Sequence, residues 1–261
     1  AAPVPATPVR DVMERDVVTI NCHAPLSEAV AALQSSGRPL VGIIDDEFPT
    51  PPPGTAPLEV RREGGRLVLA SPGFAVAFEN GGLVSYRLKE EELLAGPLVP
   101  HLWRVPTDND EGGGPASFAH RWREAGLDAL KAVAQEPRVE RLADNQVRVV
   151  IESRLTGKAA GLRLRTIYDV DGLGGIRVGA VFESDGKLPP LPRVGFQVQL
   201  PGTLSTAEWY GPGPHESYAD RKRGARLGRF RAKVADLHFP HVMAQENGNR
   251  TRVRWVEAVT G

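Results

Sequence analysis

Alternation of apolar and polar residues with a period of two is the feature that most constrains how this chain folds. The alternating segments are Val147–Ile151, Leu162–Tyr168, Ile176–Phe182 and Val194–Leu200. Successive side chains of a β-strand point to opposite faces of a sheet, so this period predicts strands with one buried face. Several such strands at regular spacing predict a mostly-β chain built as an antiparallel β-sandwich.

Glycine and proline punctuate the chain between these apolar runs. There are 28 Gly and 23 Pro residues, roughly one residue in five, against about one in eight in an average protein. Asn80-Gly81-Gly82 separates the strand candidates Phe74–Phe78 and Leu83–Leu88, and these residue types tolerate the positive φ of a tight hairpin turn. Arg66–Leu69 is predicted as a further strand before this hairpin.

One helix is predicted between Pro115 and Leu130. Phe118, Trp122, Ala125 and Ala129 recur there at helical spacing and are expected to share one face.

The chain divides into four segments by composition. Residues 1–8 are a Pro/Ala-rich lead-in, and residues 9–48 have a β-α-β pattern. Residues 49–57 read PTPPPGTAP, which favours an extended linker. The strand-rich part occupies residues 58–261.

Composition also excludes several classes of protein. Lys+Arg and Asp+Glu are both 32, so the zero net charge argues against a nucleic-acid partner. No apolar run approaches the roughly 18 residues that cross a bilayer, and no signal-peptide pattern opens the sequence as given. A single cysteine, Cys22, excludes an internal disulfide and a Cys-rich metal site. The expectation is a soluble cytoplasmic protein with no membrane partner.

Three motifs carry a resemblance to a known family. They are Arg-x-Pro-x-Asp-Asn-Asp within Trp103–Asp110, Gly-x-Gly-Pro-x-Glu-x-Tyr-x-Asp-Arg within Glu208–Arg221, and Glu-Asn-Gly-x-Arg within Gln245–Thr251. In this order and spacing they resemble the C-terminal domain, or small chain, of family-two β-galactosidases, over about residues 57–261. The resemblance implies a galactose-mutarotase-like antiparallel supersandwich, and in that family the domain runs past the last motif, so C-terminal truncation is expected.

The resemblance implies hydrolysis of terminal β-D-galactosides by the complete enzyme, with Mg or Na as ions such an enzyme could use. A retaining glycosidase needs two carboxylates about 5 Å apart, and the family keeps both on a (β/α)₈ barrel of roughly 200 residues or more. Residues 57–261 are already taken by the sandwich, so no catalytic residue is expected in this chain. The expected partners are a β-galactoside or galactose and a catalytic barrel chain or homo-oligomer, and the chain alone is expected to be inactive.

Residues of the three motifs are candidates for the wall of the sugar pocket or for a domain contact. They are Arg104, Asp108, Asn109, Asp110, His215, Glu216, Glu246 and Asn247. For residues 108–110 the alternatives are a mobile loop before Gly112–Gly114 and an Asx-rich turn bonded to its own backbone, with Arg104 as an ion-pair partner. The segment around Glu216 is interpreted as turn scaffolding, with Trp209 and Tyr218 as core anchors. No metal site is predicted, because His238 and His241 lack a third ligand.

The first segment resembles a different family. Val9–Met13, Asp16–Ile20 and Pro25–Val30 look like the opening of a CBS module, which often binds adenosine nucleotides. A nucleotide-sensing CBS fusion is therefore one alternative function. Two others come from the strand-rich part: a free-standing carbohydrate-binding module, and a mutarotase that uses His215 and Glu216.

Overall fold

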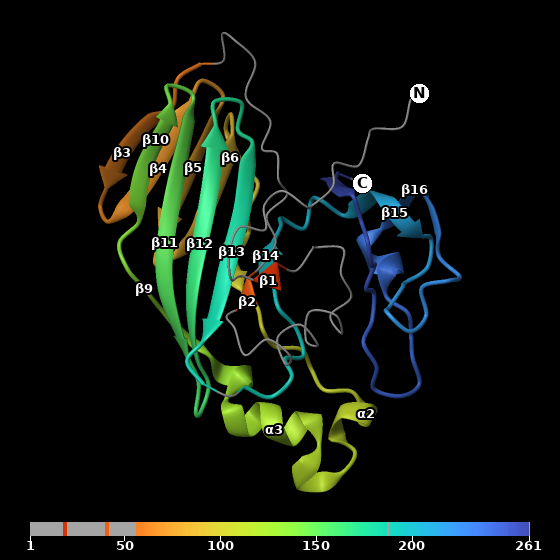
Figure 1. Ribbon diagram of the computed structural model, residues 1–261. Helices are drawn as coiled ribbons and strands as arrows, with labels where there is room; N and C mark the ends of the chain where they lie inside the picture. The colour runs from red at the N-terminus through yellow and green to blue at the C-terminus, as the bar shows by residue number, and fades with distance from the viewer. Residues whose placement is uncertain (1–17, 20–39, 42–55, 187, 261) are drawn as a thin grey trace.

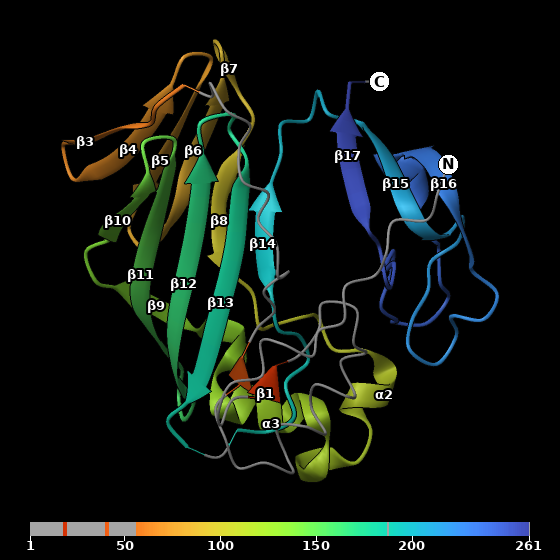
Figure 2. The same cartoon turned by 45° about the horizontal axis from the view of Figure 1, so that its top comes forward.

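The computed structural model describes residues 18–19, 40–41, 56–186 and 188–260. Two mainly antiparallel sheets pack face to face, and a third, smaller sheet lies beside them (Figure 1). The turned view separates the third sheet from the two packed layers (Figure 2). The predicted mostly-β antiparallel sandwich is therefore confirmed.

The first sheet contains the long alternating strands. Its order is β1 (Val18–Thr19), β2 (Leu40–Val41), β13 (Ile176–Ser184), β12 (Gly161–Asp171), β11 (Gln146–Thr156) and β10 (Arg138–Ala143), with β9 (Lys131–Ala134) also paired to β11. Short strand β2 lies antiparallel to β13, and β1 lies parallel to β2. The segment expected to be a separate β-α-β unit thus adds two strands to this sheet. The helix predicted between them and the proline-rich linker at 49–57 lie outside the described residues, apart from Ala56 and Pro57.

The second sheet forms the opposite layer. Its order is β14 (Phe196–Gln199), β8 (Gly96–Pro100), β6 (Gly82–Leu88), β5 (Phe74–Glu79), β4 (Arg66–Ser71) and β3 (Glu59–Glu63), with β7 (Glu91–Glu92) paired to β6. The predicted hairpin is confirmed, because Asn80 and Gly81 have φ values of 49° and 87° between β5 and β6. Position 81 also has no room for a side chain, since a Cβ there would lie 2.4 Å from the Cβ of Ala134.

The core lies between these two sheets. Leu69 and Phe78 of the second sheet face Ile151 and Tyr168 of the first, and all four are fully buried. The rings of Phe78 and Tyr168 meet edge to face with centroids 4.9 Å apart. Period-two alternation therefore predicted the buried faces of the long strands correctly. It was wrong for Val194–Leu200, where β14 covers only Phe196–Gln199 and Val198 and Leu200 are exposed.

The helical region is shorter than the sequence predicts. Helix α3 covers only Phe118–Ala125, followed by a 3₁₀ turn at Leu127–Ala129, and Gly126 ends the helix with φ 74°. Trp122 and Ala125 are buried as expected, but Phe118 and Ala129 are exposed, so the predicted shared face is wrong at both ends. The left-handed glycine turns the chain before Ala129 can join that face.

Part of the segment Glu208–Arg221, interpreted from its sequence as turns, is a strand of the third sheet. Strand β15 (Thr206–Gly213) lies between β16 (Arg226–Lys233) and β17 (Trp255–Val259). The interpretation of this segment as turn scaffolding is wrong for Gly211, Pro212 and Gly213, which continue the strand. The bends begin after the cis bond between Gly213 and Pro214. Trp209 is a buried anchor, as expected.

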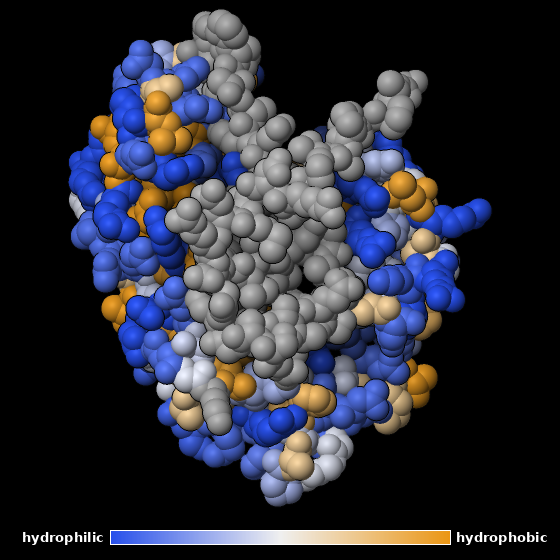
Figure 3. All heavy atoms as spheres, in the orientation of Figure 1, coloured by the Kyte–Doolittle hydropathy of each residue, from blue (hydrophilic) through white to orange (hydrophobic). Residues whose placement is uncertain are grey.

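Much of the described surface in Figure 3 is hydrophilic, with hydrophobic residues in small groups. No helix among the described residues is long and apolar enough to span a membrane.

Candidate functional site

The three sequence motifs meet where the sandwich faces the third sheet. The first motif contains the one-turn helix α2 (Asp108–Glu111), which lies next to α3 below the sandwich (Figure 1). The Asp108 backbone N–H donates to the carbonyl of Ala244, just before the third motif, at 3.2 Å. Glu246 of the third motif lies 3.1 Å from Arg193 and 3.7 Å from Arg104. Segments far apart in the sequence are thus held together by polar contacts.

Arg104 and Asp110 form a largely buried ion pair. The two Nη atoms of Arg104 lie 2.5 and 3.0 Å from the Asp110 carboxylate, and the side chains are only 16% and 10% exposed. Asp110 also accepts hydrogen bonds from the Thr107 backbone N–H and hydroxyl at 2.7 and 2.8 Å, which caps α2. Burial alone raises the pKa of Asp110, but the bonds from Arg104 and Thr107 outweigh burial and lower this pKa below its ordinary value.

Asp108 and Asn109 differ from their neighbour Asp110. Both are exposed, and the Asp108 carboxylate accepts the backbone N–H of Asn109 at 3.0 Å. This contact bonds the segment to its own backbone, but it reaches the next residue and not the second residue on, as an Asx turn does. Gly113 and Gly114 follow with φ values of 99° and 59°, which an ordinary side chain rarely adopts.

Glu216 is held from three directions in the loop that follows β15. One carboxylate oxygen accepts from Arg221 at 2.7 Å and lies 3.1 Å from Nε2 of His241. The other accepts the backbone N–H of Gly248 at 2.9 Å. Burial alone raises the pKa of Glu216, but Gly248, His241 and Arg221 lower it below its ordinary value. Glu216 therefore joins the second motif to the third as a bound carboxylate.

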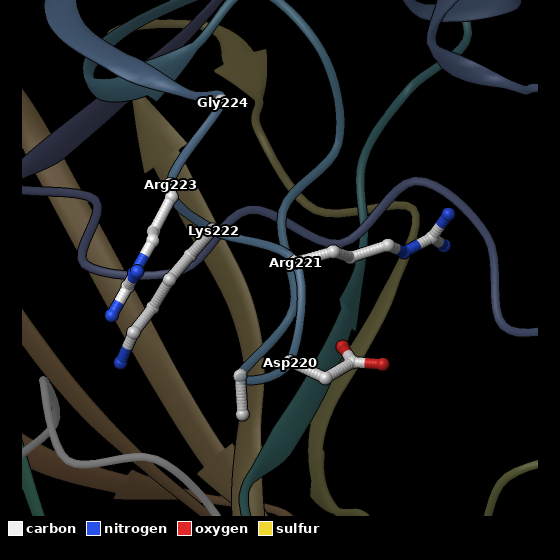
Figure 4. Close-up of a pocket in the computed structure, with 6 residues that line it drawn as sticks. Asp220, Arg221, Lys222, Arg223 and Gly224 are labelled. Carbon is white, nitrogen blue, oxygen red and sulfur yellow. The ribbon is translucent and has the colours of Figure 1, made fainter.

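A basic loop continues from Glu216 and lines an open pocket of about 660 Å³ formed by residues 219–224. Figure 4 shows the side chains of Lys222 and Arg223 pointing to one side of this loop and those of Asp220 and Arg221 to another. Arg221 bonds Glu216 and stacks on the ring of Tyr218, 4.6 Å from its centroid. The prediction of Tyr218 as a core anchor is wrong, because its ring is half-buried beside Glu216 and Arg221, whereas Trp209 is buried as expected. We call the ion pairs of Asp110, Glu216 and Glu246, with the side chains that contact them, the polar cluster.

Asn247 fastens its own loop. Its Oδ1 accepts the backbone N–H of Phe239 at 2.9 Å, and its Nδ2 donates to the carbonyl of Phe239. His215, in contrast, is exposed, and no hydrogen bond joins its side chain to another described residue. Glu216 takes part in the contacts between the second and third motifs, and the mutarotase alternative stays a prediction.

Sequence reasoning missed Arg193 and Arg250 as members of this cluster. Arg250 stacks on Trp209, 4.8 Å from the ring centroid, and donates to the carbonyls of Gly248 and Pro214 at 2.7 and 3.2 Å. Burial lowers the pKa of this guanidinium. Arg250 stands inside the Glu-Asn-Gly-x-Arg motif, which was the available signal; Arg193 belongs to no motif.

The polar cluster has the chemistry of a scaffold. Asp110, Glu216 and Glu246 each contact a guanidinium, and Glu216 is further held by an amide and an imidazole. Carboxylates held in this way are suited to fixing loops, because each already accepts a charge-assisted hydrogen bond from a guanidinium. Within the described ranges, no group of three or more potential metal ligands gathers.

Comparison with known proteins matches this chain to one family. The family described as "Beta galactosidase small chain" matches residues 70–261. The chain is 32% identical to a β-galactosidase of Vibrio cholerae over 211 residues, which are 77% of this chain and 21% of that protein. It is 31% identical to one of Priestia megaterium over 193 residues, 72% of this chain and 18% of that protein. A β-galactosidase of Halalkalibacterium halodurans is 34% identical over 189 residues, 70% of this chain and 18% of that protein.

The chain therefore spans about a fifth of the length of these curated relatives. The matched region contains all three motifs and begins after residues 9–48. The likeness of that first segment to a CBS module stays a prediction.

Proposed function

Because the chain belongs to the β-galactosidase small-chain family, we propose that it forms the sandwich part of an enzyme that hydrolyses terminal β-D-galactosides. The match of residues 70–261 to this family is the observation that carries the proposal. In this role the domain packs beside a catalytic (β/α)₈ barrel and completes one wall of the sugar pocket.

The arrangement of the candidate carboxylates supports a positioning role. A retaining glycosidase needs one carboxylate as nucleophile and another, about 5 Å away, as acid and base. Asp110 and Glu216 are instead held by several donors each, with pKa values below the ordinary range. A carboxyl with a lowered pKa is a poor general acid near neutral pH. We therefore expect the catalytic pair, and any Mg or Na ion, on the barrel portion of the enzyme.

Replacement of the matched region in a relative tests the proposal. The 211 matched residues of the Vibrio cholerae β-galactosidase would be exchanged for residues of this chain, and kcat/KM measured with nitrophenyl β-galactoside. We expect the chimera to hydrolyse nitrophenyl β-galactoside and the purified chain alone not to hydrolyse it. A soluble, assembled chimera without hydrolysis contradicts the proposed role, and turnover by the rigorously purified chain contradicts the assignment of the chemistry to another part.

Thermal unfolding separates this proposal from an independent binding module. A ligand that binds only the folded state raises the unfolding midpoint by mass action. We expect no shift of the midpoint with galactose, because the pocket wall is incomplete without the barrel. A galactose-specific rise favours the free-standing carbohydrate-binding module, and a rise with AMP favours the CBS fusion.

A further inference from the structure

The tripeptide Glu-Asn-Gly occurs twice in the chain, at residues 79–81 and 246–248. An Asn-Gly pair is chemically labile. The backbone nitrogen of glycine attacks the side-chain Cγ of asparagine, the Cγ–Nδ2 bond breaks, and ammonia leaves behind a cyclic imide. Water then opens the imide to aspartate or isoaspartate. Glycine favours the attack because no Cβ shields its nitrogen.

The two copies have the same preceding and following residue, so their immediate sequence gives them similar intrinsic reactivity. Any large difference between their rates in the native chain must then come from structure. Both asparagines are exposed and both glycines are half-buried, so the structure distinguishes the two copies by their hydrogen bonds.

The first copy lies at a hairpin tip, where Gly81 packs on Ala134 but the reacting groups have no hydrogen-bond partners among the described residues. Asn80 and Gly81 form the tip of the hairpin between β5 and β6, and Asn80 is exposed with φ 49°. Its side chain makes no hydrogen bond to any other described residue, and no described acceptor takes the N–H of Gly81. Neither reacting group is restrained by such a bond.

In the second copy, hydrogen bonds hold both reacting groups, the carboxamide of Asn247 and the backbone N–H of Gly248. The carboxamide of Asn247 is held by the N–H and carbonyl of Phe239, so it must leave both partners before it can rotate toward the attacking nitrogen. The N–H of Gly248 donates to Glu216 at 2.9 Å. That proton must be removed for attack, and an anion forming beside a carboxylate is disfavoured by like charge.

Glu216 is itself a firm partner. Its side chain is only 11% exposed and is fixed by Arg221 and His241. The hydrogen bond that holds Gly248 therefore depends on the same polar cluster that joins the second and third motifs.

We propose that Asn80 is a site of spontaneous deamidation, with water as the second reactant, and that Glu216 keeps the identical Asn247–Gly248 pair from reacting. Conversion of Asn247 would replace the amide donor to Phe239 with a carboxylate, next to Glu246 and near Glu216. The new carboxylate would face the carbonyl of Phe239 as one acceptor against another, so this contact would be lost. Glu216 thus preserves the chemical integrity of the loop that carries the third motif.

Peptide mapping of the full chain tests the proposal. The protein is incubated at 37 °C at mildly alkaline pH and sampled over days. Trypsin separates the two pairs, since cleavage after Arg66 and Arg87 releases the peptide with Asn80, and cleavage after Lys233 and Arg250 releases the peptide with Asn247. Mass spectrometry then follows deamidation at each site. We expect Asn247 to react at least about tenfold more slowly than Asn80, because its hydrogen bonds must open first.

Two comparisons isolate the cause. In concentrated urea the rates at Asn80 and Asn247 should become equal within about twofold, because unfolding removes the lock. In the native chain Glu216→Gln should raise the rate at Asn247 and leave that at Asn80 unchanged. Glu136→Gln, at an exposed position, is the matched control and should change neither rate.

Equal rates in the native wild-type chain would overturn the proposal. A difference that persists in urea would also overturn it, because sequence and not structure would then be responsible. The urea comparison needs no variant and so remains decisive if Glu216→Gln does not fold. A native Glu216→Gln chain with an unchanged rate at Asn247 would refute the role of Glu216.

Discussion

Replacement of Asp110 by asparagine removes the charge that Arg104 needs while keeping nearly the same shape. Arg104 would stay largely buried, with 16% of its side chain exposed, and would keep only its longer contact with Glu246, at 3.7 Å. Breaking a fully buried ion pair costs roughly 3–5 kcal/mol. The residual exposure and the carbonyl that asparagine retains reduce this cost, so we expect Asp110→Asn to lower the free energy of unfolding by about 2–3 kcal/mol.

The effect should depend on pH in a defined direction. The folded state lowers the pKa of Asp110, so the stabilisation is fully present above the ordinary aspartate value near pH 4. It is lost as pH falls through the lower pKa of the folded state, where the carboxylate becomes protonated. The difference between wild type and Asp110→Asn should therefore be largest near neutral pH and shrink in acid.

Urea denaturation of both proteins, followed by circular dichroism at several pH values, measures this difference. With a denaturant slope of about 2 kcal/mol per molar, the midpoint should fall by roughly 1–1.5 M at neutral pH. Glu136→Gln is the control, because its pair with Arg62 is exposed and should be worth less than about 1 kcal/mol. A loss of under about 1 kcal/mol for Asp110→Asn would show that the pair behaves as a surface contact, which would refute the reasoning.

Further stability measurements test the helical region and the Glu216 loop. Trp122→Ala should lower the free energy of unfolding, measured by urea denaturation, by about 3–5 kcal/mol. The reason is that this 3%-exposed ring fills part of the core and its Nε1–H donates to the carbonyl of Pro190 at 2.6 Å. A loss below about 1 kcal/mol would show that neighbouring side chains fill the cavity. Gly126→Ala should lower the melting temperature more than Gly64→Ala, since both have positive φ but only at Gly126 would a Cβ meet backbone, at 2.2 Å; equal shifts would contradict the clash. Glu216→Gln should remove a stabilisation that the wild type loses as pH falls through the lowered pKa of Glu216; unchanged acid unfolding would contradict the role of this carboxylate.

The strands show how far local pattern predicts structure. Alternation identified the long strands β11, β12 and β13 and their buried faces, because the side-chain period of a strand is a property of neighbouring residues. It failed for β15, where glycines and prolines obscured a strand that its partners β16 and β17 hold in place. Pairing between distant segments overrode local composition there.

The prediction of the helix between Pro115 and Leu130 failed for a related reason. Spacing placed Ala129 on the face of Trp122, but Gly126 turns the chain at a point where it packs closely against Lys158. This contact joins residues more than thirty positions apart, and no window of the sequence contains both.

The sequence by itself determined the fold class, the hairpin at Asn80 and the family, because each rests on local periodicity, turn chemistry or a contiguous motif. Tertiary structure alone decided what the candidate residues do. Asp108 and Asp110 are two positions apart, yet one is exposed and the other is buried against Arg104. Glu216 and Gly248 are brought together from positions 32 residues apart. The state of a carboxylate depends on its burial and its partners, and these are set by the packing of segments that lie far apart in the chain.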